Sequence, residues 1–161
     1  LAASFASTAF ADPPACTVGE PRQRYCGEAS FPLILQNVHR YFMFITFGVL
    51  AILAWDVWKA CWFDDGLGGV RFGIGVGTRV LGVNVVLLAN YVLGCHSLRH
   101  VVGGMCDVIS TRPARHQAYR CVSALNRRHM LWAWCSLCSV GLSDLYVRLC
   151  SMGIWTDWRI L

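Results

Sequence analysis

Residues 41–63 read YFMFITFGVLAILAWDVWKACWF and contain one acid and one lysine, both near the end of the stretch. A helix needs about 20 mainly apolar residues to cross the roughly 30 Å hydrocarbon layer of a bilayer. Lipid offers no hydrogen-bond partner to backbone N–H and C=O groups, so a spanning segment of this length has to be helical. The stretch therefore predicts a transmembrane helix.

Two further blocks have the same character. Residues 80–98 (VLGVNVVLLANYVLGCHSL) lack Asp, Glu, Lys and Arg, and residues 130–152 (MLWAWCSLCSVGLSDLYVRLCSM) contain one Asp and one Arg. The alternative is that all three blocks are core helices of a soluble protein, but helices without a polar face would leave nothing to meet water. We therefore predict an all-α membrane protein with three transmembrane helices near 41–63, 80–98 and 130–152.

The overall composition agrees with this class. Of the 161 residues 56% are hydrophobic and only 14% are charged, whereas about 25% of the residues in ordinary soluble domains are charged. Tryptophan and phenylalanine gather at the ends of the apolar blocks, as in the aromatic belts at membrane interfaces. These residues are Trp55, Trp58, Trp62, Phe63, Trp132, Trp134, Trp155 and Trp158.

The distribution of Lys and Arg predicts the orientation. With three spans, the N-terminal segment and the loop from Arg99 to Arg128 share one side, which holds nine arginines against five Lys and Arg on the other side. The positive-inside rule then places the N-terminus in the cytoplasm, or on the matrix side in an organelle. Residues 1–30 are rich in Ala, Ser and Pro and are expected to form an irregular, processed or truncated terminus, so the membrane domain is expected to comprise residues 31–161.

Histidine and cysteine are concentrated on the side expected to be cytoplasmic. His96 and His100 are four residues apart, share a helix face and close the second span, while His129 opens the third; Cys95 and Cys121 lie in the same layer. Imidazole and thiolate together suit an iron–sulfur cluster, haem iron or zinc. Alternatively, these side chains are interfacial residues without a metal. The sequence has no HExxH motif, which argues against a zinc-dependent membrane enzyme.

Four strings carry a resemblance to a known family: NVHRYF (37–42), GCHSLRHVVGG (94–104), YRCVSALNRRHMLWAW (119–134) and DLYVRLCSMGIWTDWRIL (144–161). From about residue 37 to its end the chain resembles the membrane anchor subunit of succinate dehydrogenase, complex II, of the actinobacterial type. The resemblance implies a three-helix anchor bundle in the bacterial plasma membrane. It also implies that the anchor docks the flavoprotein and iron–sulfur subunits on its cytoplasmic face and passes electrons from succinate to a quinone, expected to be menaquinone, without catalytic residues of its own.

The resemblance also implies a cofactor, for which two alternatives stay open. A Rieske-type [2Fe–2S] cluster takes two Cys and two His; Cys95, Cys121, His100 and His129 would supply them, with His96 as a competing ligand, although the spacing departs from that of soluble Rieske proteins. A haem b held by two His is the other alternative. A third interpretation is a purely structural subunit of a respiratory complex, in which the His and Cys residues are incidental.

Two further groups of residues are candidates for function. A quinone ring would be framed by Arg99, Arg128, Trp132 and Ser136, with Arg and Ser donating hydrogen bonds to its carbonyls. Asp144 and Arg148 lie four residues apart in the third span and can pair on one helix face. Charges at membrane depth usually face other helices or a wet cavity, so this pair is either an internal ion pair or part of a second quinone or proton route with Asp56.

Overall fold

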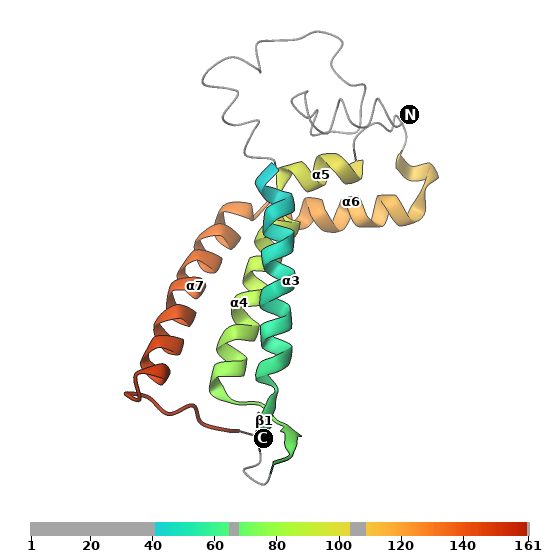
Figure 1. Ribbon diagram of the computed structural model, residues 1–161. Coiled ribbons are helices and arrows are strands. Elements are labelled where there is room, and N and C mark those ends of the chain that lie inside the picture. The colour runs from blue at the N-terminus through green and yellow to red at the C-terminus, as the bar shows by residue number, and fades with distance from the viewer. Residues whose placement is uncertain (1–40, 65–67, 104–108, 161) are drawn as a thin grey trace. The chain divides into compact units, whose positions relative to one another are not determined.

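The computed structural model describes residues 41–64, 68–103 and 109–160, without the side chains of His100 and Ser110 (Figure 1). The expected irregular segment 1–30 lies outside the described residues. The described elements follow one another as α3 (Phe42–Ala60), β1 (Trp62–Asp64), β2 (Val70–Phe72), α4 (Val76–Leu93), α5 (His96–Gly103), the 3-10 turn η2 (Ile109–Thr111), α6 (Pro113–Asn126) and α7 (His129–Ser151).

Three of these helices, α3, α4 and α7, are long and apolar enough to cross a membrane. The prediction of an all-α membrane protein with three spanning helices is thereby confirmed. The bounds of the second helix differ from the expected 80–98, because α4 begins at Val76 and ends at Leu93. The backbone turns at Gly94, where the amide of Cys95 donates to the carbonyl of Val92 at 3.1 Å, and His96 starts the separate helix α5.

The pattern of burial is the reverse of that in a soluble protein. The buried side chains in the long helices are mostly small and polar, for example Ser136 and Asn84, which are each 4% exposed. Large apolar side chains such as Ile52 and Leu142 are 63% and 65% exposed. Small polar residues let helices approach closely inside a membrane, and lipid covers the apolar side chains that water would otherwise meet.

The described chain divides into two compact units, which are considered separately below. Unit 1 contains Val92–His129 and the start of α3 up to Thr46, and unit 2 contains Phe47–Tyr91 and Met130–Leu161. Most of each spanning helix therefore belongs to unit 2, while α5, η2 and α6 belong to unit 1.

A short antiparallel hairpin connects α3 to α4 in unit 2 (Figure 1). Trp62 pairs with Phe72 across the two strands, and their rings meet edge to face with centroids 5.7 Å apart. Trp58 contacts Trp62 in the same way on the other side, also at 5.7 Å. Edge-to-face pairs of this kind stabilise a short hairpin that lacks a buried face of its own.

The C-terminal tail of unit 2 is fastened to the beginning of α4. Helix α7 ends in a Schellman motif, in which Gly153 takes a φ of +73° and the amide of Ile154 donates to the carbonyl of Leu149 at 3.0 Å. Further along, the carboxylate of Asp157 accepts hydrogen bonds from the amide of Gly77 and the hydroxyl of Tyr146, each at 2.8 Å. The first amides of a helix lack partners within it, so a residue 80 positions away in sequence completes the N-terminus of α4.

In unit 1, α5 and α6 pack against each other as a helical hairpin (Figure 1). The side-chain amide of Asn126 donates to the carbonyl of Gly94 at 2.8 Å, which joins the end of α6 to the beginning of α5. At the other end of α5 a Cβ atom added to Gly103 would overlap the ring of Tyr119 on α6. The hairpin therefore requires glycine at position 103.

We predict that Gly103→Ala destabilises the hairpin, because the added methyl group forces the Tyr119 ring away. The expected loss is about 1–3 kcal/mol, as for other overpacked sites. Gly82→Ala is the matched control: Gly82 lies within α4 and has open space around its Cβ position, so the higher helix propensity of Ala leaves stability equal or greater. The rate of proteolytic cleavage between α5 and α6 and the thermal unfolding temperature in detergent are compared for the two variants. Equal resistance to cleavage in both would contradict the prediction.

Candidate functional site

Arg99 is the centre of the α5–α6 hairpin. Its guanidinium donates to the hydroxyl of Tyr119 at 2.9 Å and to that of Ser123 at 3.1 Å. It also lies over the Tyr119 ring, 5.3 Å from the centroid, a cation–π arrangement. Arg115 on α6 donates in the opposite direction, to the carbonyl of Val102 on α5. These bonds hold two short helices together that bury little apolar surface, since Val122 is the buried residue of α6.

The structure places the proposed metal ligands of unit 1 as follows. Cys95 and His96 stand at the beginning of α5, and His129 is the first residue of α7. Cys121 is exposed on α6, and the side chain of His100 lies outside the described residues. Within the part of the chain that the structure describes, no three His, Cys, Asp or Glu side chains form a group that could hold a metal ion.

Helix geometry shows which way Cys121, one of the expected Rieske ligands, points from α6. Tyr119, Ser123 and Asn126, at helical spacing, form the face of α6 that bonds to α5 and the turn before it. At 100° per residue Cys121 points away from that face, whereas Cys95 lies on the α5 side. Cys121 therefore does not face α5, and the four-ligand set stays a prediction.

The four candidate quinone residues fall into both units. Trp132 and Ser136 in unit 2 are four residues apart on one face of α7, together with the buried Ser143. The hydroxyl of Ser136 donates to the carbonyl of Ala133 at 3.0 Å, whereas the indole Nε1 of Trp132 is buried and has no hydrogen-bond partner among the described residues. A buried N–H without a partner is costly, and no described residue accepts the hydrogen bond of this indole. Arg99 and Arg128 belong to unit 1.

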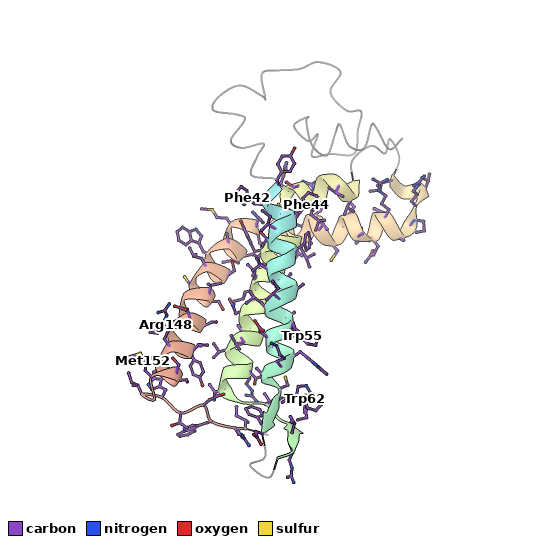
Figure 2. All side chains as sticks on the ribbon, viewed as in Figure 1. Phe42, Phe44, Trp55, Trp62, Arg148 and Met152 are labelled. Atoms are coloured by element: carbon purple, nitrogen blue, oxygen red, sulfur yellow. The ribbon has the colours of Figure 1, made fainter. Side chains whose placement is uncertain are left out.

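The expected pair of charges in the third span forms an ion pair within α7. The Nε atom of Arg148 lies 2.7 Å from Oδ2 of Asp144. Both side chains are exposed, and Figure 2 shows Arg148 on the lower part of α7. Asp56, which was considered as a third member, pairs instead with Lys59 on its own helix at 3.5 Å. The two charges therefore neutralise each other on the surface of α7, and the ion pair does not link α7 to another described helix.

Comparison with known proteins identifies the family of this chain. A family described as actinobacterial succinate dehydrogenase subunit SdhC matches residues 3–153. The chain belongs to this family. Its structure is also similar to a chain of the solved Mycobacterium smegmatis Sdh1 complex in the apo form, with a TM-score of 0.73 and 39% sequence identity over 99% of this chain. The present chain spans 59% of the length of that neighbour. No curated protein matches the sequence.

Membership of the SdhC family confirms the resemblance found in the sequence. Sequence reasoning singled out Arg99 but missed the residues that hold it, Tyr119 and Ser123. The sequence contains a pattern that indicates them, because positions 119, 123 and 126 repeat at the spacing of one helix face. The role of Asp157 could not have been found in this way, since its partner amide at Gly77 is set only by the path of the chain.

We predict that Arg99→Ala loosens the hairpin, because it removes two hydrogen bonds and a cation–π contact at once. With the partial exposure of this side chain taken into account, the expected loss is about 1–2 kcal/mol. Hydrogen exchange of the α5 amides provides the measurement. Arg112→Ala serves as a control, since the Arg112 side chain is exposed; equal exchange in the two variants would refute a bracing role for Arg99.

Proposed function

We propose that this chain is the membrane anchor of a succinate:quinone oxidoreductase. In this role it docks a flavoprotein and an iron–sulfur subunit at one membrane face and provides the place where a quinone, expected to be menaquinone, receives their electrons. The observation that carries the proposal is the match to the SdhC family over residues 3–153, together with the similarity to a chain of the Sdh1 complex. The chain itself is proposed to be a non-catalytic subunit.

The low burial of the spanning helices supports a role as a subunit. In the spanning stretches of α3, α4 and α7 only 6%, 22% and 11% of residues are buried within the described structure. Their apolar sides are therefore available to lipid and to the helices of other subunits. The exposed ion pair of Asp144 and Arg148 adds to this, because charges at membrane depth are stabilised by neighbouring helices or a wet cavity.

Trp132 is the best supported member of the proposed quinone site. Its buried indole N–H lacks a partner among the described residues, and quinone carbonyls are hydrogen-bond acceptors. Ser136 lies one helical turn further on the same face of α7 and keeps its own hydroxyl satisfied. Arg99 and Arg128, which the sequence also suggested as donors to a quinone, belong to unit 1, where the Arg99 guanidinium is bonded to Tyr119 and Ser123.

The cofactor is the less supported part of the proposal. A Rieske-type cluster or a haem b would transfer single electrons between the iron–sulfur subunit and the quinone. The proposed ligands are Cys95, Cys121, His100 and His129, with His96 as a competitor. The orientation of Cys121 away from α5 argues against a Rieske ligand set contained within the hairpin.

We predict that the tagged chain, expressed with its companion subunits, copurifies with succinate-oxidising activity. Trp132→Phe keeps an aromatic ring and removes the indole donor, so quinone reduction should fall by about 2- to 13-fold for one lost hydrogen bond. Oxidation of succinate by a soluble dye should be unchanged, because that chemistry lies in another subunit. Trp134→Phe is the matched control, since Trp134 is exposed on the same helix.

The same preparation tests the cofactor. A visible and electron paramagnetic resonance spectrum distinguishes a Rieske cluster from haem. For a Rieske cluster, His100→Ala, His129→Ala, Cys95→Ser and Cys121→Ser each abolish the signal, whereas for haem only the histidine changes matter. Unaltered spectra and quinone reduction in all four variants would leave the structural-anchor alternative, and copurification without any succinate oxidation would refute the proposed function.

We further propose that the N-terminus is cytoplasmic, on the basis of the excess of arginine on that side. Three spans place the C-terminus on the opposite side. An alkaline phosphatase reporter fused after Leu161 should therefore be active, while a fluorescent protein that folds only in the cytoplasm should be dark at the same position. The reverse result would overturn both the orientation and the assignment of the hairpin unit to the cytoplasmic face.

A further inference from the structure

The net positive charge of this protein is concentrated in one part of the chain. The chain has a formal net charge of +5. Residues 92–129 contain six arginines and one acid, Asp107, so this segment alone has a formal charge of +5 and the remainder is neutral. The segment includes α5 and α6, which form the hairpin of unit 1. A charge distribution this uneven produces a local positive potential.

The exposed side of α6 concentrates this charge. One side of the helix bonds to α5 through Tyr119 and Ser123. The opposite side, termed here the arginine face, is exposed throughout. It consists of the exposed residues Gln117, Arg120, Cys121 and Ala124 of α6, with the exposed C-cap residue Arg127 at its edge. The side chains of Arg120 and Arg127 make no hydrogen bond or ion pair with any residue that the structure describes, in contrast to Arg99 and Arg115.

We infer that the arginine face of α6 docks an acidic protein surface, and that this surface belongs to the soluble subunits that the anchor holds. The inference rests on the proposed function and identifies the part of the chain that performs the docking. Arginine forms paired hydrogen bonds to carboxylates and is enriched at protein interfaces. The small side chains of Cys121 and Ala124 between the arginines allow a partner backbone to approach closely.

Anionic lipid is the other source of negative charge, and the composition of the face disfavours it. A helix that lies in a membrane interface inserts large apolar side chains between the lipids. The arginine face carries none, because the apolar Val122 of α6 is buried. The hairpin is also held in place by the bonds of Arg99, Arg115 and Asn126. A preordered surface binds a folded partner at a low cost in conformational entropy.

The experiment uses the assembled complex, purified through a tag on this chain. Arg120→Glu with Arg127→Glu reverses two charges on the face, and Arg71→Glu, on the exposed strand β2 of unit 2, is the matched control. We expect the double variant to hold the soluble subunits at least about tenfold more weakly, with earlier release as salt is raised. Quinone reduction falls in parallel, while the released subunits keep their dye-linked succinate oxidation. Arg71→Glu behaves as the wild type.

A second readout remains valid if charge reversal disturbs folding. Gln117→Cys places a thiol on the arginine face and Arg71→Cys places one on β2. A membrane-impermeant maleimide, with peptide mass spectrometry to locate it, should label position 117 in the isolated anchor and spare it in the solubilised complex. Position 71 should be labelled in both.

Several outcomes would overturn the inference. These are retention of the soluble subunits by the double variant as tightly as by wild type, equal weakening by Arg71→Glu, and full labelling at position 117 in the complex. Loss of binding to phosphatidylglycerol vesicles with intact subunit retention would assign the face to lipid instead. If no succinate oxidation copurifies with the tagged wild-type anchor, the proposed function is wrong. The inference that the soluble subunits bind the arginine face is then wrong as well.

Discussion

A peptide N–H or C=O group inside a bilayer finds no water, so every residue of a crossing segment has to bond within the chain. This constraint accounts for the three long helices of the structure. It also removes the usual reason to bury apolar side chains, since lipid tails solvate leucine as well as a protein core does. Ile52 and Leu142 are therefore exposed, while the helix surfaces that are covered contain Asn84, Ser136 and Ser143.

The same constraint acts at the helix ends, where four amides or carbonyls have no partner within the helix. Two of the described solutions bring in a side chain from elsewhere in the chain, and a third is a local turn. Asp157 accepts from Gly77 at the start of α4, and Asn126 donates to Gly94 just after the end of α4. The Schellman turn at Gly153 completes α7. These contacts are polar and directional, and they supply the order that a conventional apolar core would supply in a soluble domain.

A chain built in this way is suited to work as part of a larger assembly, as its membership of the SdhC family implies. Its membrane helices leave their apolar sides open, and its net charge is carried by the hairpin unit. The apolar helix sides are complementary to lipid or to other membrane helices. The basic hairpin is complementary to a polar partner. The buried indole N–H of Trp132 is a further group that finds no hydrogen-bond partner among the described residues.

The sequence by itself determined the class, the three spans and the family, because length, hydropathy and family-specific strings are local properties of the chain. It also predicted the pair of Asp144 and Arg148, since helical spacing alone brings those side chains together. Only the tertiary structure decided that the second helix ends at Leu93, that Cys121 faces away from α5, and that Asp157 completes α4. Those features depend on contacts between residues up to 80 positions apart, and the direction of the backbone at turns such as Gly94 determines which distant groups can meet.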